Sequence, residues 1–160
     1  MTDDLARTVA ALRDAAAVEP RGWTLAQAVA HCAQSIECSI TGYPKLRSGL
    51  FRATIGPIVK RKFLRAGAMS HDCTAPIAGA PDIPADVTLG AACDRADAAI
   101  RAFAAHQGAL APHLAYGACS KDEYAALHLL HLRDHLRAFG LDLTAPPPGG
   151  AARAPAVDKA

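Results

Sequence analysis

Apolar side chains recur every three or four residues in several long segments of the chain, and this spacing predicts amphipathic helices. We expect helices over about 3–17, 24–41, 86–106 and 120–139. The basic segment 45–65 should form a further helix that kinks or divides at Gly56-Pro57, because proline inside a helix removes a backbone hydrogen bond. The Pro-, Ala- and Gly-rich connection 67–86 is longer than most loops, and loops of that length are uncommon unless they are functional or mobile.

Capping signals mark where two of these helices begin. Thr24 with Gln27, and Ser120 with Glu123, have the spacing of a capping box, in which each side chain binds a free backbone N–H of the other residue. Gly140 stands where a glycine commonly ends a helix. A third helix should be capped by Asp86 or by Thr88.

Composition supports a helical protein. Hydrophobic residues make up 51% of the 160, and most of them are alanine and leucine, which favour helices over strands. We therefore expect an all-α fold, with the helices packed as a bundle over residues 1–141. The remaining residues, 142–160, are Pro- and Ala-rich and poor in large apolar side chains, which predicts a disordered tail.

Charge, cysteines and hydropathy narrow the class of protein. The chain has a formal net charge of only +2 and lacks a recognition motif, so we expect no nucleic-acid partner. No apolar run reaches the roughly 20 residues that a membrane span needs, and the acidic N-terminus is not a secretory signal. Five scattered cysteines without a CxxC pair indicate reduced thiols, so we expect a cytoplasmic protein without a membrane partner.

Three histidines lie on one stripe of the last expected helix. His131 and His135 are about 40° apart around the helix axis, and His128 lies one turn earlier on the same side. One ion about 2.0–2.1 Å from each nitrogen cannot bind all three, because His128 and His135 stand about 10 Å apart along the axis. The spacing allows His128/His131 or His131/His135 as a chelating pair and does not choose between them.

A metal site would need a further ligand from elsewhere in the chain. His31 is the best candidate because it lies in an apolar stripe in the middle of the second expected helix. A core histidine bonded to a carbonyl oxygen explains the same position equally well, so both interpretations stay open. Other candidates lie in the long connection or just before the last helix: His71, Asp72, Cys73 and His113.

Three short motifs carry a resemblance to a known family: "WTLAQAVAHC" (23–32), "HLAYGACSKDEY" (113–124) and "HLLHLRDHLRAFG" (128–140). Together they resemble the DinB/YfiT-like superfamily, and within it a branch of uncharacterised proteins with a domain of unknown function. The resemblance covers about Asp3 to Leu141. It implies a four-helix bundle, here with an additional short N-terminal helix, and a metal site built from three histidines.

The resemblance also selects the metal ligands. His31 would come from the second helix, and His131 and His135 from the last, so His128 becomes a neighbour of the site. The ion would be divalent, with Zn²⁺ first and Ni, Fe or Mn as alternatives. Two positions depart from the branch: Asp134 stands where a histidine often precedes the second ligand, and Leu114 follows His113 where proline is usual.

Characterised members of the superfamily suggest what such a site does. They are similar in using the ion for thiol-dependent transfer or isomerisation with glutathione, mycothiol or bacillithiol, and others are amidases. By this resemblance we expect a metal-dependent S-transferase or isomerase, or a hydrolase, acting on a small molecule; a homodimer is an allowed assembly. The alternative is a non-catalytic helical bundle that binds a ligand or a partner.

Several nearby residues have a plain structural interpretation. Glu37 and Asp134 are candidate general bases but are more typical of solvated helix charges. Cys32 and Cys38 are expected to pack as small apolar side chains, and Trp23 to anchor the start of its helix. Basic residues in 45–65 would attract an anion or form an ordinary solvated helix face: Lys60, Arg61, Lys62 and Arg65.

Overall fold

The computed structural model describes residues 1–13 and 22–141. Within them the chain forms six helices and no β-strand, which confirms the all-α prediction. The helices are α1 (Thr2–Leu12), α2 (Leu25–Thr41), α3 (Gly49–Ala53), α4 (Ile55–Ala66), α5 (Leu89–Ala105) and α6 (Lys121–Ala138). Residues 14–17 of the first expected helix, and the tail expected over 142–160, lie outside the described residues.

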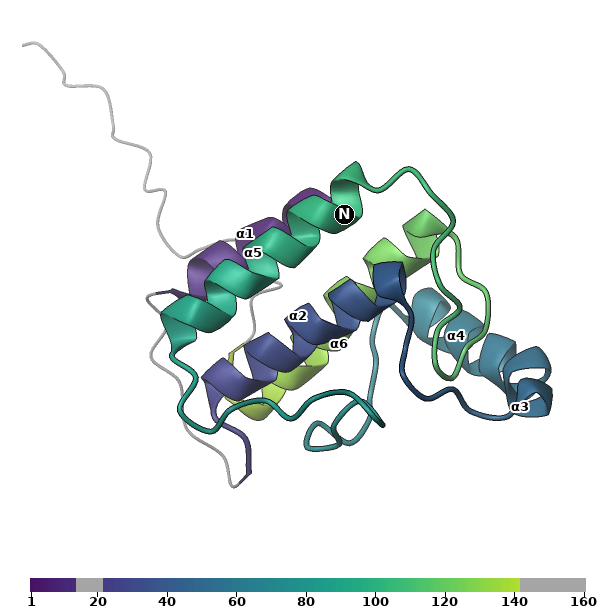
Figure 1. Cartoon of the computed structure of the whole chain (residues 1–160), viewed down its shortest axis with the longest axis horizontal. Coiled ribbons are helices and arrows are strands. Elements are labelled where there is room, and N and C mark those ends of the chain that lie inside the picture. Colours follow the sequence, from purple (N-terminus) through teal and green to yellow (C-terminus); the bar gives the residue numbers. More distant parts are fainter. Residues whose placement is uncertain (14–21, 142–160) are drawn as a thin grey trace, which may run out of the picture.

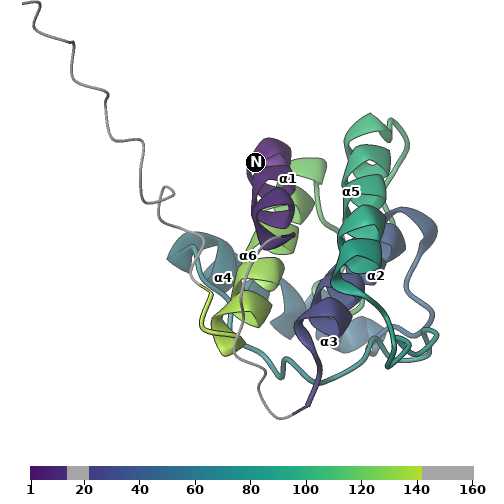
Figure 2. The same ribbon diagram turned by 90° about the vertical axis from the view of Figure 1, so that its left-hand side faces the viewer.

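Four of these helices share the main core (Figure 1). α2 packs against both α5 and α6, and α1 packs against the same two helices. Figure 2 shows the arrangement from the side, with α1 above α6 and α5 above α2. α1, expected as an additional short helix, instead contributes Leu5, Val9 and Leu12 to this core. The helices of the basic segment, α3 and α4, contribute no residue to this core.

Alanine supplies much of the buried surface of α2 and α5. The buried alanines are Ala26, Ala28, Ala30 and Ala33 on α2 and Ala92, Ala96 and Ala99 on α5. Because the distance between two helix axes depends on the side chains at their contact, short side chains let the helices approach closely. The core therefore combines alanine contacts between α2 and α5 with a few large buried aromatic side chains: Phe103, Tyr124 and Phe139.

The capping signals place the helix ends as predicted. Both capping boxes form, Thr24 with Gln27 and Ser120 with Glu123. Thr88 rather than Asp86 caps α5, since its hydroxyl accepts the Ala91 N–H at 3.2 Å. Each of these caps satisfies backbone donors that a helix leaves free in its first turn. The ends of the core helices are thus fixed largely by local sequence.

The basic segment divides into α3 and α4, which lie to one side of the four core helices (Figure 1). The break falls at Thr54, and Pro57 occupies the first turn of α4, where a missing N–H costs nothing. Gly56 packs so closely on a neighbouring turn that an added Cβ would lie 2.2 Å from the Ala115 carbonyl oxygen. Only glycine allows α4 to approach this turn, and the turn itself forms one wall of the cavity described below.

The long connection 67–86 contains no helix or strand, as expected, yet it is attached to the helices at several points. Met69 and Ile77 are buried, and the Gln34 side chain donates a hydrogen bond to the Pro81 carbonyl at 2.9 Å. Among the described residues, no helix combines the length and apolar character that a membrane-spanning helix requires. The connection therefore belongs to the packed structure and can supply residues to a site.

Candidate metal centre

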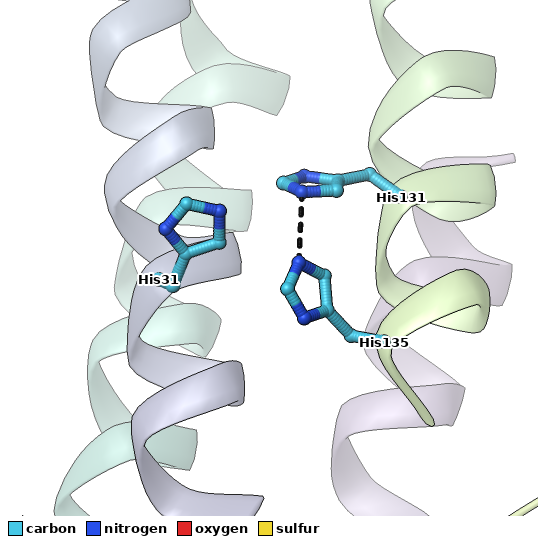
Figure 3. Close-up of side chains that lie close together, drawn as sticks. All are labelled: His31, His131 and His135. Atoms are coloured by element: carbon cyan, nitrogen blue, oxygen red, sulfur yellow. Dashed lines mark hydrogen bonds between the residues drawn. The ribbon is translucent and has the colours of Figure 1, made fainter. Parts of the chain in front are cut away.

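α2 and α6 bring His31, His131 and His135 together between them (Figure 3). The ring centroid of His31 lies 5.2 Å from that of His131 and 5.1 Å from that of His135. The two α6 rings are 4.8 Å apart, as the one-turn spacing allows. We call these three residues the histidine cluster. Its members come from two helices whose facing positions are set by the main core.

The donor atoms of the histidine cluster lie close enough together for their rings to turn toward one shared ion. Nε2 of His131 and Nε2 of His135 are 3.1 Å apart, and one ligand atom from each of the three rings lies within 4.8 Å of the others. Two imidazoles on one tetrahedral ion at about 2.0–2.1 Å place their nitrogens roughly 3.3–3.4 Å apart. The α6 pair thus needs only a small adjustment to share an ion.

The surroundings keep these imidazoles neutral. His31 and His135 are buried, with 4% and 1% of their surface exposed, and His131 is half-buried. Burial, reinforced by the neighbouring histidines, lowers the pKa of His31 to about 4 and that of His135 to about 3. The same causes hold the pKa of His131 well below its ordinary value. A neutral imidazole has the lone pair that a metal ligand needs.

Buried nitrogens without a protein partner are a second sign of a polar site. Among the described residues, Nδ1 of His31 and Nδ1 of His135 are enclosed and make no hydrogen bond within the protein. Buried polar atoms of this kind are rare, because each lost hydrogen bond to water costs about 1–3 kcal/mol. Because the two α6 rings approach each other through Nε2, an ion held there would still leave Nδ1 of His135 without a partner.

The connection 67–86 adds His71 to the edge of the histidine cluster. Its ring centroid lies 4.8 Å from that of His131 and 5.0 Å from that of His135. Asp134 holds it there: one carboxylate oxygen accepts the His71 backbone N–H at 3.1 Å and lies 2.7 Å from the ring Nδ1. Asp134 is 7% exposed, so its interpretation as a solvated helix charge was wrong.

A second group of donor atoms includes this loop. His71, Cys73 and His135 place one ligand atom each within 4.8 Å of one another. Burial and the nearby Asp134 carboxylate raise the pKa of the Cys73 thiol to about 11, which keeps it protonated at neutral pH. Since the thiolate is the form that binds metal, the histidine cluster is the better prepared of the two groups.

His128 and His113 lie outside both groups. The His128 ring packs between Phe103 and Tyr124, with centroid distances of 5.4 and 5.3 Å. His113 accepts the backbone N–H groups of Ala115 and Tyr116 at its Nδ1, at 3.1 and 3.2 Å. Burial lowers the pKa of His113 to about 4 and that of His128 to about 3. Of the two pairs that helical spacing allowed, only His131/His135 meets the α2 histidine.

Other residues singled out in the sequence take structural places near the site. Trp23 is half-buried and covers the histidine cluster, with its ring 4.9 Å from that of His31. Cys32 is buried in the core, where burial raises the pKa of its thiol, as expected of a packing residue. Glu37 forms a two-point ion pair with Arg95 at 2.8 and 2.6 Å, away from the histidines.

A cavity of about 560 Å³ adjoins the histidine cluster, a volume typical of small-molecule sites. His31, His71 and His131 form part of its wall. The remaining wall comes mainly from segments between helices: residues 45–47, the connection 67–86 and the turn 113–116. Sequence periodicity identifies the helical part of this site but gives no information on how the connecting segments close over it.

The helices and the site together define an all-α protein with a candidate metal centre. The chain belongs to the family described as "Protein of unknown function (DUF1569)", whose model matches residues 2–141. The match includes α1 to α6 and every residue of the histidine cluster. Comparisons with curated proteins and with solved structures found no match.

Proposed function

We propose that this protein is a metal-dependent enzyme in which His31, His131 and His135 hold one divalent ion. The observation that carries the proposal is the meeting of three neutral imidazoles, with one nitrogen of each ring within 4.8 Å of the others and the α6 pair 3.1 Å apart. Zn²⁺ fits nitrogen ligands at these distances, and Ni, Fe and Mn are alternatives. Three protein ligands leave a coordination position for a substrate, which is typical of catalytic rather than structural sites.

We further propose that the fold is a four-helix bundle of the DinB/YfiT-like type, formed within residues 1–141. The shared core of α1, α2, α5 and α6 supports this arrangement. So does the origin of the ligands, with one histidine on α2 and an i, i+4 pair on α6. The family match over residues 2–141 supports the extent of the domain.

The chemistry that we propose is transfer or isomerisation with a low-molecular-weight thiol as co-substrate. When bound, the ion would lower the pKa of a thiol and so supply a thiolate near neutral pH. The chain itself contributes shape and order: Trp23 covers one side of the cluster, and Asp134 fixes His71 at the other. The adjoining cavity has room for the rest of a small substrate.

A second candidate function rests on the cavity alone. A protein that binds a small molecule without catalysis would need its apolar walls, including Met69, Ile77 and Leu127, and would not need an ion. The two functions separate on one property, since only the enzyme requires the histidine cluster to bind metal. In the ligand-binding protein, variants of the cluster would change stability and the cavity wall, to which His31 and His131 contribute, but not metal content.

Cobalt substitution tests the thiol chemistry directly. Untagged protein loaded with Co²⁺ would be titrated with glutathione, bacillithiol or mycothiol while its absorption spectrum is recorded. We expect a new near-ultraviolet band typical of a sulfur ligand with at least one thiol, and no band with S-methylglutathione, which lacks a free thiol. If none of the three thiols changed the Co²⁺ spectrum, the proposed metal site would stand and the proposed thiol chemistry would be contradicted.

A further inference from the structure

The cavity beside the histidine cluster has a basic wall as well as an imidazole wall. Lys45 and Arg47, from the segment before α3, line the same cavity as His31 and His128. The two basic side chains are exposed, whereas these two histidines are buried. The positive charges therefore lie toward solvent and the imidazoles toward the core, with the cavity between them.

The two basic groups are available to a ligand. Within residues 1–13 and 22–141, neither Lys45 nor Arg47 forms an ion pair with a carboxylate. The Arg47 backbone N–H donates to the Leu114 carbonyl at 2.9 Å, which fixes the segment, while its guanidinium lies 5.1 Å from the centre of the Phe51 ring. Backbone and aromatic contacts thus set the position of Arg47, and no carboxylate compensates the charge of either residue.

Negative charge is scarce along the rest of the cavity wall. Asp72 is the one acidic residue among the lining residues that the structure describes. Its carboxylate accepts the backbone N–H of Thr74 at 2.9 Å and the hydroxyl of the same residue at 2.7 Å. These bonds engage Asp72 with its own loop. Two basic groups against one carboxylate leave the described wall with a net positive charge, which favours an anion.

We propose that this cavity binds an organic anion with an apolar body and a carboxylate or phosphate group held by Lys45 and Arg47. Apolar side chains such as Met69, Ile77 and Leu127 would contact the body of the molecule. Its remaining end reaches the histidine cluster, and that part of the inference rests on the proposed function. Arg47 suits the task because a guanidinium can bind two oxygens of one carboxylate or phosphate.

The basic residues of α4 do not serve this cavity. Lys60 donates to the Glu123 carboxylate and to the Ala118 carbonyl, both at 2.8 Å. With Arg61 and Arg65 it lines a separate, smaller hollow. Within the segment 45–65, the anion site thus lies at Lys45 and Arg47 rather than at the basic residues of α4.

Calorimetric titration of the full chain tests the proposal with three probes of one chain length. Octanoate and octyl phosphate carry the anionic group, and octanamide is their neutral counterpart. We expect at least one anion to bind more tightly than the amide, and Lys45→Gln/Arg47→Gln to weaken that anion roughly three- to tenfold, as two partly solvated charges should. Lys62→Gln/Arg101→Gln, which removes the same charge from exposed positions outside the cavity, should change nothing.

Each titration would be run on zinc-loaded and on chelator-treated protein, so that the anion site and the metal site are judged separately. Loss of anion preference in Lys45→Gln/Arg47→Gln, in both preparations, supports the proposal even if the protein proves not to be a metalloenzyme. Equal binding of octanamide, or anion binding that is insensitive to this double variant, overturns it. Anion binding that requires zinc alone would place the carboxylate at the ion, and would also overturn it.

Discussion

The histidines of this protein have two kinds of surroundings: some pack singly against aromatic rings, and the histidine cluster brings three imidazoles together. His128 on α6 is buried between the rings of Phe103 and Tyr124. One turn later, His131 and His135 face each other nitrogen to nitrogen and meet His31 from α2. Burial lowers the pKa of both groups, so burial alone does not identify a ligand. The convergence of nitrogens distinguishes the cluster from histidines that pack against aromatic rings.

Acidification should have the largest effect on the stability of the fold, because it protonates the cluster histidines and the other buried histidines together. The depressed pKa values belong to five residues: His31, His113, His128, His131 and His135. The unfolded chain takes up these protons near pH 6.5, while the folded chain resists them until about pH 4 or below. Between these values the unfolded state holds more protons, so the free energy of unfolding must fall as the pH falls.

For one such histidine, acidification from pH 7 to pH 5 should cost about 2 kcal/mol of stability. The four histidines whose pKa falls to about 4 or 3 together approach the roughly 5–15 kcal/mol of a typical domain, so metal-free protein should unfold in mild acid. Urea denaturation of chelator-treated protein across this range measures the effect. Zinc should raise stability at pH 7 and shift the loss to lower pH, whereas a flat profile from pH 7 to pH 5 would contradict the account.

The second largest effect should come from replacing the α2 ligand, which distinguishes the histidine cluster from the other buried histidines. His31→Gln removes the one ligand of the histidine cluster that α2 supplies. We expect zinc affinity to fall on the order of a thousandfold, about 4 kcal/mol. His113→Gln is the control, since His113 is half-buried and neutral but lies outside the cluster. Competition with a coloured chelator measures both affinities. Equal affinity for zinc in the two variants would remove His31 from the site.

Asp134→Asn should separate the loop from the cluster at a smaller cost. The buried carboxylate accepts hydrogen bonds from His71 and Arg137, and an amide cannot accept all of them. We expect a loss of about 1–3 kcal/mol of stability and faster amide hydrogen exchange in 67–86. Asp72→Asn, at an exposed position in the same loop, is the control. Unchanged exchange in Asp134→Asn would show that the His71–Asp134 contact does not hold the loop.

His128→Leu should have the smallest effect. Nε2 of His128 is buried and has no hydrogen-bond partner among the described residues, so replacing the ring by an apolar side chain removes an unfavourable group. We expect the free energy of unfolding at pH 7 to change by less than about 1 kcal/mol, with zinc affinity unaltered. Thermal denaturation and zinc titration measure the two quantities. Loss of zinc in this variant would make His128 part of the metal site.

Much of the fold could be predicted because its signals are local. The capping boxes at Thr24 and Ser120, and the apolar period of the core helices, are properties of adjacent residues. The role of α1 could not be predicted in this way, since its place in the core depends on packing against α5 and α6. The break at Thr54 was expected near Gly56-Pro57, but its position depends on how α4 meets the turn that contains Ala115.

The candidate site likewise has a part that local sequence predicts and a part that depends on packing. Helical spacing limited the α6 ligands to two pairs, and a family resemblance indicated His31 as their partner from α2. His71 was only one of several loop candidates, because nothing in its own segment shows that Asp134 would hold it. A buried acidic residue next to a helical histidine was the available signal for that contact. The basic segment 45–65 was evident from the sequence, but the place of Lys45 and Arg47 in the cavity wall depends on three connecting segments.

Elemental analysis of untagged protein tests the central claim most directly. Wild-type protein, His131→Ala and His128→Ala would be purified side by side from zinc-supplemented cultures, and metal content would be measured per folded chain. We predict close to one divalent ion in the wild type and in His128→Ala, and almost none in His131→Ala with its helical content retained. Wild-type protein without metal, or His131→Ala with as much metal as the wild type, would contradict the account.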